Sequence, residues 1–261
     1  MKINFFKYHG TGNDFIILDN RTGEYSTLTN LQIKNLCERR FGIGADGLML
    51  FELVDGYDFK MTYFNSDGLR GTMCGNGGRC MTQFAFDTGL TRFTYRFIAS
   101  DGPHESEITN DKIIRLKMKD VNEIENHGTF AILDTGSPHY IKFVSELADV
   151  DVEENGRDIR YSKRFAADGI NVNFVEVIND SRISVRTYER GVEEETLSCG
   201  TGVTAAAIAS AHNPKGFNRV EVNTKGGILS VEYNCIDDQH FDNIWLCGPA
   251  EFVFKGVMEI N

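Results

Sequence analysis

Two cysteines stand directly before glycine-rich segments, and each segment leads into a run that favours a helix. The first is at residues 74–77, which read CGNG, and the second is at residues 199–202, which read CGTG. The first backbone N–H groups of a helix have no partner inside the helix and carry a partial positive charge, so they favour a thiolate or carboxylate beside them. Such a position lowers a thiol pKa from about 8.5 into the range of roughly 3.5 to 7.5. The pattern therefore predicts two thiols, Cys74 and Cys199, that exchange protons near neutral pH.

The repetition of this arrangement in both halves of the chain predicts a pocket with one thiol on each side. Inverting a carbon that carries an ammonium and a carboxylate removes a proton from one face and delivers one to the opposite face, so one base per face suffices. A thiolate and a thiol can share this task and exchange roles when the reaction reverses. Backbone amides at the two helix starts would then stabilise the negative charge. The alternative is that both glycine-rich turns are only tight connections between a strand and a helix.

Short β-rich runs separated by turn residues dominate the first half of the chain. Predicted strands cover residues 3–8, 15–18, 48–53, 59–64, 92–99, 106–109 and 113–118. One predicted helix covers residues 27–40, with Thr27 or Thr29 as its cap, and a second covers residues 78–86 after the first cysteine.

A second cycle of the same kind begins near Gly128. Predicted strands cover residues 130–134, 140–144, 172–178, 183–188, 219–223, 229–233, 244–246 and 252–258, and a helix covers residues 203–212 before Asn213 and Pro214. Both cycles place strands before and after a cysteine-headed helix, although no residue-by-residue repeat is visible. The order predicts an α+β protein of two topologically similar domains, each a strand-rich sheet wrapped around a central helix. The polar segment 121–127 is the expected boundary, which gives domains at 1–121 and 122–249.

The composition is that of a globular protein and argues against two classes of partner. Of the 261 residues, 41% are hydrophobic and 25% are charged, which is enough for two domains with cores of their own. The net charge of −11 disfavours nucleic acid or an anionic membrane as the main partner, because binding phosphate needs a basic face. No run approaches the roughly 20 apolar residues of a membrane span, and residues 1–6 do not resemble a signal peptide, so we expect a cytoplasmic protein.

Six cysteines are present, but their spacing does not favour a disulfide framework or a zinc site. No pair has C-x-x-C spacing, and the six histidines form no compact cluster with them. The sequence therefore predicts no metal site. The cysteines other than Cys74 and Cys199 are expected to pack in the core, and they are Cys37, Cys80, Cys235 and Cys247.

Eight short motifs, in order along the chain, resemble those of the diaminopimelate epimerase family. They read HGTGNDF at 9–15, GIGADG at 42–47, FNSDG at 64–68, CGNG at 74–77, GSPH at 136–139, NV at 171–172, YERG at 188–191 and CGTG at 199–202. Any one of them is weak alone, whereas eight in order are specific and span nearly the whole chain. The resemblance implies the fold of that family, with the active site in the cleft between two domains and residues 250–261 returning to the first domain.

The resemblance also implies an activity, the interconversion of LL- and meso-2,6-diaminopimelate on the route to lysine and peptidoglycan, with no cofactor. It implies that Cys74 and Cys199 are the catalytic acid and base. The substrate-binding positions that it implies are Asn13, Asn65, Gly75, Asn76, Asn171, Glu189, Arg190, Gly200 and Thr201. The helix-start amides among them would hold the α-carboxylate, and Arg190 would grip the distal carboxylate with two hydrogen bonds. His139 and Glu189 match positions near the cysteines, where they would tune thiol ionisation or bind the substrate ammonium.

Three positions depart from the family pattern. Ser137 stands where the family often has asparagine, Gly47 stands where many members have glutamine, and residues 69–70 (LR) replace a common Ser-Glu pair. The first two lie near expected substrate contacts, so they bear on the geometry of the distal pocket rather than on the reaction.

Two other functions and one assembly state stay open from the sequence. A proline or hydroxyproline racemase shares the fold and the paired cysteines in outline, but its substrate has no distal amino acid group for Asn65, Asn171 and Arg190 to bind. A thiol redox or binding protein that uses Cys74 and Cys80 is the second alternative. A homodimer is an expectation from the resemblance alone.

Overall fold

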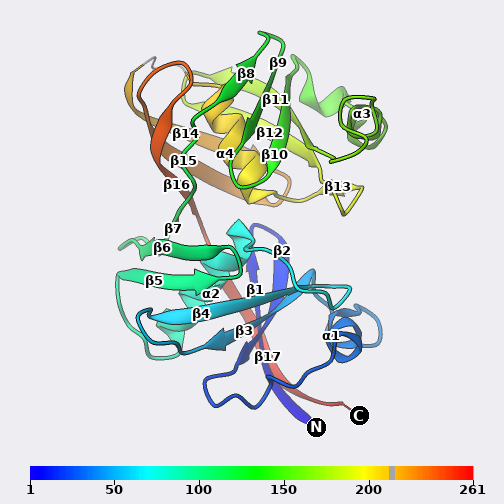
Figure 1. Ribbon diagram of the computed structural model, residues 1–261, viewed down its shortest axis with the longest axis vertical. Coiled ribbons are helices and arrows are strands. Elements are labelled where there is room, and N and C mark those ends of the chain that lie inside the picture. The colour runs from blue at the N-terminus through cyan, green and yellow to red at the C-terminus, as the bar shows by residue number, and fades with distance from the viewer. Residues whose placement is uncertain (212–214, 261) are drawn as a thin grey trace. The chain divides into compact units, whose positions relative to one another are not determined.

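Two helices headed by the predicted cysteines lie within two strand-rich units (Figure 1). The computed structural model describes residues 1–211 and 215–260. One unit comprises Met1–Leu116 with the returning segment from Gly248, and the other comprises Lys117–Cys247. Helix α2 (Gly75–Asp87) belongs to the first unit and helix α4 (Gly200–Ala209) belongs to the second.

The first unit is a mixed sheet whose strands surround α2. The strands are β1 (Lys2–Gly10), β2 (Asn13–Asp19), β3 (Gly47–Glu52), β4 (Phe59–Asn65), β5 (Thr94–Ala99), β6 (Gly102–Ile108), β7 (Ile114–Lys117) and β17 (Glu251–Glu259). They lie in the order β17-β1-β2-β3-β4-β5-β6-β7, with β2–β3 and β4–β5 parallel and the other neighbours antiparallel. Helix α1 (Asn30–Cys37) makes the crossing between β2 and β3, and α2 makes the crossing between β4 and β5.

The second unit repeats this topology strand for strand. Its strands are β8 (Ile124–Asn126), β9 (Phe130–Asp134), β10 (Pro138–Phe143), β11 (Asn171–Asn179), β12 (Arg182–Tyr188), β14 (Gly216–Thr224), β15 (Gly227–Cys235) and β16 (Phe241–Gly248). Along the order β8-β9-β10-β11-β12-β14-β15-β16, the pairs β10–β11 and β12–β14 are parallel and the others are antiparallel. Helix α3 (Val152–Arg160) and the 3₁₀ turn η1 (Leu147–Asp149) lie in the first crossing. Helix α4 and the short strand β13 (Glu195–Thr196) lie in the second. The predicted α+β fold of two similar halves is confirmed.

Both cysteine-headed helices begin three residues earlier than predicted, because their glycines form the first turn instead of a preceding loop. In α2 these glycines pack closely: a Cβ on Gly77 would lie 3.0 Å from Met49 Sδ, and one on Gly78 would lie 3.2 Å from a methyl carbon of Leu116. The predicted helix 27–40 is shorter, at Asn30–Cys37. The predicted end of the last helix, at residues 212–214, lies outside the described residues.

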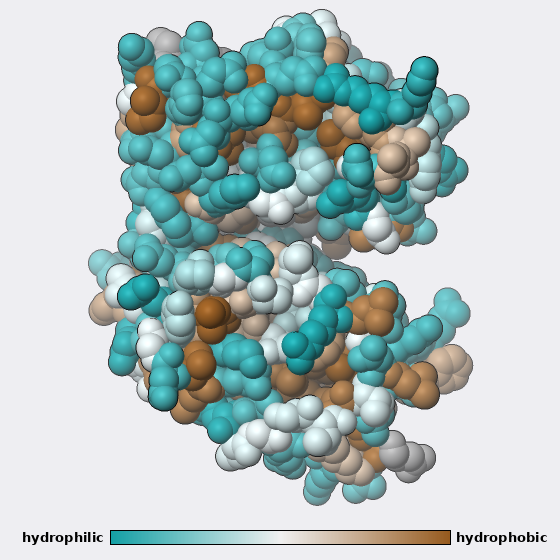
Figure 2. Space-filling view, in the orientation of Figure 1, coloured by the Kyte–Doolittle hydropathy of each residue, from teal (hydrophilic) through white to brown (hydrophobic). Residues whose placement is uncertain are grey.

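Four elements of the described chain were not predicted: β8, η1, α3 and β13. Strand β8 lies inside the polar segment 121–127, which is the predicted domain boundary. Helix α3 has a charged, weakly apolar sequence, yet it is stabilised by Asp151, whose carboxylate caps the amide of Glu154 at 3.0 Å. By contrast, α4 is buried on nearly all sides, as its run of alanine, valine and isoleucine predicts. The view in Figure 2 is mostly hydrophilic, in keeping with the charge of the chain.

Candidate active site

Cys74 is the N-cap residue of α2. Its backbone is extended (φ −100°, ψ 128°), and its carbonyl accepts the first helical hydrogen bond from the amide of Gly78 at 2.7 Å. The amides of Gly75 and Asn76 therefore have no acceptor within the helix and point out of its N-terminus. The predicted juxtaposition of a thiol with the start of a helix is present in this unit.

Asn13 lies beside Cys74 because a tight hairpin joins β1 to β2. The two turn residues, Thr11 and Gly12, have positive φ angles of 50° and 84°, as in the type I′ turns that suit hairpins. The Cys74 thiol donates to Asn13 Oδ1 at 3.6 Å, and Asn76 Nδ2 donates to the same oxygen at 3.2 Å. The oxygen of Asn13 thus accepts from both the Cys74 thiol and the Asn76 amide group.

Four charged side chains hold the Asn13 amide in this orientation. Asn13 Nδ2 donates to Asp46 Oδ2 at 2.6 Å, and Arg39 bridges Asp46 and Asp14 at 2.6 Å each. The buried Lys7 lies 2.7 Å from Asp14. Burial raises the pKa of Asp14, but the hydrogen bonds from Arg39 and Lys7 outweigh it and hold the pKa at about 2. The Asp14 carboxylate therefore keeps its charge at neutral pH.

Gly47 has no room for a side chain. A Cβ on Gly47 would lie 2.5 Å from the Tyr63 ring and 2.6 Å from the carbonyl oxygen of Phe64. Asn65, at the end of β4, is exposed, and its carbonyl accepts from Gly68 in the following turn at 2.9 Å. Tyr63 thus occupies the space into which a side chain at position 47 would extend.

Cys199 is the N-cap residue of α4, as Cys74 is of α2. Its backbone is extended (φ −109°, ψ 111°), and its carbonyl accepts from the amide of Val203 at 2.9 Å. The amides of Gly200 and Thr201 are in the first turn, and Thr201 Oγ1 lies 3.4 Å from the Cys199 sulfur. The second unit thus also presents a thiol at the start of a helix.

His139 connects to this cysteine through Thr201. Its Nε2 atom lies 2.9 Å from Thr201 Oγ1, and its Nδ1 atom lies 3.0 Å from Asn173 Nδ2. Burial lowers the pKa of His139 to about 3, and the positive charge of Arg190 adds to the effect. The imidazole is therefore neutral at physiological pH and acts on the thiol through a hydroxyl.

The side chain of Asn171 is used within the second unit. Its Nδ2 atom donates to Ser137 Oγ at 2.7 Å and to the Pro138 carbonyl at 3.1 Å, while its Oδ1 atom accepts from the Arg190 amide at 2.9 Å. The guanidinium of Arg190 donates to the carbonyl of Asp168 at 2.9 Å. Ser137 thus partners the amide of Asn171, which aligns the start of β10 with the turn that follows β12.

Glu189 begins the turn that carries Arg190. Its amide donates to the carbonyl of Glu194 at 3.1 Å, and its carbonyl accepts from the amide of Glu193 at 2.8 Å. This turn closes directly after the end of β12, so it fixes the backbone at both predicted positions.

Six residues that support the half-sites were not selected from the sequence. They are Lys7, Asp14, Arg39, Asp46, Asn173 and Thr187. Asp14 and Asp46 fall within two of the family motifs, so the sequence held a signal for both. Asn173 and Thr187 look in the sequence like ordinary polar residues of strands, so nothing there distinguishes them.

The four remaining cysteines are buried, as expected of core residues. Burial raises the pKa of Cys37 to about 12 and raises the pKa values of Cys80 and Cys235 as well. These thiols are therefore protonated at neutral pH and are poor nucleophiles.

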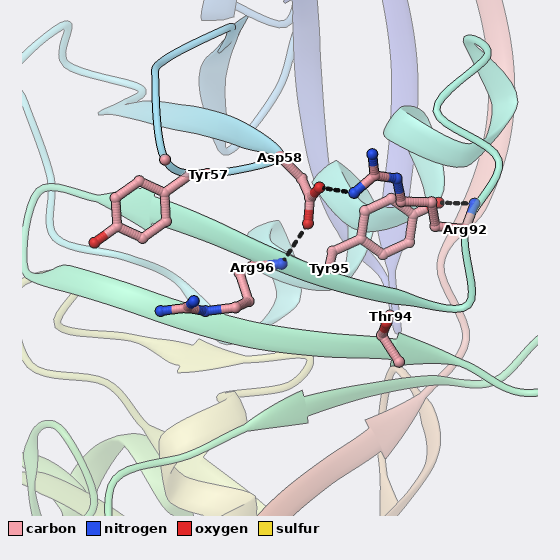
Figure 3. A pocket seen from close by; sticks show the side chains of 7 residues that line it. Tyr57, Asp58, Arg92, Thr94, Tyr95 and Arg96 are labelled. Atoms are coloured by element: carbon pink, nitrogen blue, oxygen red, sulfur yellow. Dashed lines mark hydrogen bonds and ion pairs between the residues drawn. The ribbon is translucent and has the colours of Figure 1, made fainter.

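A separate surface pocket of about 540 Å³ lies in the first unit (Figure 3). Its polar groups are paired with one another: Asp58 accepts from the Arg92 guanidinium and, at 2.8 Å, from the Arg96 amide. None of the predicted site residues lines it.

Within the described part of the chain, no cluster of three or more metal-ligating side chains occurs. No helix there is long and apolar enough to cross a membrane.

Comparison with known sequences gives one consistent family. The family model described as "Diaminopimelate epimerase" matches residues 5–123 and 131–253. A protein named diaminopimelate epimerase from Flavobacterium psychrophilum is 48% identical to this chain, and the match covers 97% of this chain and 99% of the relative. A protein of the same name from Chlorobaculum tepidum is 44% identical, and the match covers 96% of this chain and 99% of the relative.

Comparison with solved structures gives the same fold at low identity. A PhzF-family phenazine biosynthesis protein from Bacillus anthracis aligns over all of both chains with a TM-score of 0.77 and 15% identity. A hydroxyproline epimerase from Agrobacterium vitis aligns over 98% of this chain and 91% of its own, with a TM-score of 0.71 and 12% identity. At this identity the likeness establishes the fold alone.

Proposed function

The chain belongs to the diaminopimelate epimerase family, and from this premise we propose that Cys74 and Cys199 are its catalytic acid and base. It is an isomerase that interconverts LL- and meso-2,6-diaminopimelate. The observation that carries the proposal is that each cysteine caps a helix at the same topological position of two equivalent units. Neither unit alone supplies two bases, so the proposed reaction needs the thiol of each unit.

The reaction is a proton exchange at one carbon. The thiolate of one cysteine takes the α-proton, and the electron pair left behind is delocalised into the α-carboxylate. The thiol of the other cysteine then donates its proton to the opposite face of the carbon. The product has the inverted configuration, and the two sulfurs have exchanged protonation states.

The carboxylate that receives this charge is assigned to the two helix starts. The proposed donors are the backbone amides of Gly75, Asn76, Gly200 and Thr201. Their freedom from intrahelical bonding and the positive ends of both helices support this role. Each well-aimed donor of this kind contributes roughly 3 kcal/mol to the transition state.

The distal amino acid group is assigned to Asn13, Asn65, Asn171 and Arg190, and Glu189 is assigned to the substrate ammonium or to tuning of the thiols. The bonding of Asn171 to Ser137 and to the Arg190 amide supports a role in shaping this subsite through its neighbours. The closed space at Gly47 implies that the Tyr63 ring occupies part of the volume that a glutamine would fill in relatives.

A homodimer in the cytoplasm is the proposed form of the enzyme, serving lysine and peptidoglycan precursor synthesis. Strand β17 supports dimerisation, because it pairs with β1 along one edge and exposes apolar side chains on both of its faces. These side chains are Phe252, Val253, Phe254 and Val257, which are 45% to 55% exposed. A second copy would cover them.

The test is an epimerisation assay under reducing conditions with purified enzyme and chiral separation of products. LL-diaminopimelate should be converted to a mixture with the meso form, and proline and hydroxyproline should be unchanged. Turnover of proline or hydroxyproline in place of diaminopimelate would assign the enzyme to the racemases. No turnover of any of the three would favour a thiol redox or binding role.

A further inference from the structure

A chain of hydrogen bonds leads from the interior of the second unit to the Cys199 sulfur. Thr187 Oγ1 lies 2.9 Å from Asn173 Oδ1, and Asn173 Nδ2 lies 3.0 Å from His139 Nδ1. His139 Nε2 lies 2.9 Å from Thr201 Oγ1, which lies 3.4 Å from Cys199 Sγ. Asn173 and His139 are fully buried, and Thr187 is 4% exposed.

The direction of this chain is set at its buried end. The Oδ1 atom of Asn173 can only accept, so the Thr187 hydroxyl donates to it. The Nδ2 end of Asn173 then faces His139 and also donates to the Tyr140 carbonyl at 3.4 Å, which agrees with this orientation of the amide. Because Nδ2 donates to His139 Nδ1, that ring nitrogen carries no proton.

The polarity continues to the sulfur. His139 is neutral, since burial and the nearby Arg190 oppose its protonation, so its single ring proton is on Nε2. Nε2–H donates to Thr201 Oγ1. The hydroxyl hydrogen of Thr201 then points to the other described partner of that oxygen, Cys199 Sγ. A hydrogen bond donated to sulfur favours the thiolate form.

The first unit has the opposite polarity at its cysteine. Asn13 Oδ1 can only accept, and the bond from Asn13 Nδ2 to Asp46 keeps that oxygen facing Cys74. An acceptor beside sulfur favours the protonated thiol, because a thiolate would have no hydrogen to donate to it. The two cysteines therefore stand at equivalent helix starts, but Cys199 faces a hydrogen-bond donor and Cys74 faces an acceptor.

We propose that Asn173 and Thr187 are positioning residues that hold His139 as the Nε2–H tautomer, so that Thr201 donates to Cys199. Cys199 is then the thiolate of the free enzyme, and Cys74 is the thiol. The catalytic meaning of this assignment rests on the proposed function. In each turnover Cys199 takes the α-proton and Cys74 gives its own, which leaves the protonation states reversed. A proton must then pass from Cys199 to Cys74 through solvent before the next turnover in the same direction.

The hydrogen-bonded chain Thr187–Asn173–His139–Thr201, called the relay below, packs closely against α4. This close packing explains why the second glycine of CGTG, Gly202, has no side chain. A Cβ on Gly202 would lie 2.3 Å from Asn173 Oδ1 and 3.3 Å from His139 Cε1. Any side chain at this position would displace the amide whose orientation sets the relay. The glycine thus serves the ionisation of Cys199 as well as helix packing.

The test is a pH titration of the ultraviolet absorbance of the thiolates, without substrate. The difference between wild type and Cys199→Ser gives the titration of Cys199, and the difference between wild type and Cys74→Ser gives that of Cys74. Cys199 should ionise at lower pH than Cys74. Thr187→Val should raise the Cys199 midpoint by about one pH unit, which is about tenfold less thiolate below the midpoint, and leave the Cys74 midpoint unchanged. Thr204→Val is the matched control, since Thr204 is buried in α4 but donates to the Gly200 carbonyl.

A second measurement needs no variant of Asn173 or Thr187. Nitrogen NMR of histidine-labelled wild type, with His139→Gln to assign the signal, should show His139 protonated at Nε2 and bare at Nδ1 near neutral pH. Protonation at Nδ1, or a Cys74 midpoint at or below that of Cys199, would overturn the proposal. Because neither measurement uses diaminopimelate, a failed epimerisation assay rejects the function without deciding the relay.

Discussion

At the scale of single residues, the chemistry depends on what each sulfur faces. Cys74 faces an amide oxygen held by Asp46, and Cys199 faces a hydroxyl held by His139. Both thiols also stand at helix N-termini, which favour negative charge in either unit. The difference between the two cysteines therefore comes from side-chain hydrogen bonds, not from backbone position.

Gly202→Ala should destabilise the protein and abolish most activity. Alanine is the better helix former by about 1 kcal/mol, but its Cβ would overlap Asn173 Oδ1 at 2.3 Å, and overpacking of this kind costs about 1 to 3 kcal/mol. Urea unfolding and the epimerisation assay measure the two effects. Adding Asn173→Ala should recover stability without recovering activity; recovery of both would show that Asn173 has no role beyond packing.

His139 should make the stability of the protein depend on pH in the acid range. Its pKa is about 3 in the folded protein, against about 6.5 when unfolded, so the unfolded chain binds the extra proton. The stabilisation is complete above about pH 6.5 and falls by about 1.4 kcal/mol per pH unit as pH decreases toward 3. Between pH 7 and pH 5, wild type should lose about 2 kcal/mol relative to His139→Gln. If the free energy of unfolding changed with pH equally in the two proteins, this would contradict the assignment of His139 as buried and neutral.

At the scale of elements, the same strand positions serve different chemistry in the two units. The parallel pair β2–β3 corresponds to β10–β11, so Asn13 at the start of β2 and His139 near the start of β10 hold related places. Gly47 and Asn171 likewise begin the second strand of each pair. Duplicated elements therefore supply two similar helix starts, and changes at the strand starts make them chemically unequal.

Thr29→Ala should weaken the protein through α1 alone. Thr29 caps this helix, and its side chain and that of Gln32 satisfy each other's backbone amides in a capping box. Loss of the cap should lower the free energy of unfolding by about 1 kcal/mol without changing the thiol titrations. The matched control is Thr27→Ala, at the exposed threonine that sequence alone left as an alternative cap. Equal destabilisation by both changes would contradict the assigned helix start.

Most strands were predictable because alternating apolar residues and turn signals mark them. Both cysteine-headed helices were located from the residues that follow the cysteines. The glycines were harder, because CGNG and CGTG look like turns until the close approach of Met49 or Asn173 is known. Asn173 and Thr187 were not predictable at all. Strand β11 is buried on both faces from Asn171 to Val175, so no alternation marks one polar side chain as facing a site.

At the scale of the whole molecule, duplication divides the catalytic parts between two units. Each unit contributes one thiol, one helix start and one set of supporting side chains. The proposed reaction consequently needs both thiols in every turnover. Removing either one leaves the folds of both units intact but takes away one face of the proton exchange.

The most direct measurement of this claim is solvent hydrogen exchange at the α-carbon of LL-diaminopimelate in heavy water, with thiols kept reduced. Wild type should place deuterium in the meso product from its first appearance, because the thiol that reprotonates the carbon has exchanged with solvent. Cys74→Ala and Cys199→Ala should each form no meso product. Full epimerisation by either single variant, or meso product without solvent deuterium, would contradict the two-thiol account.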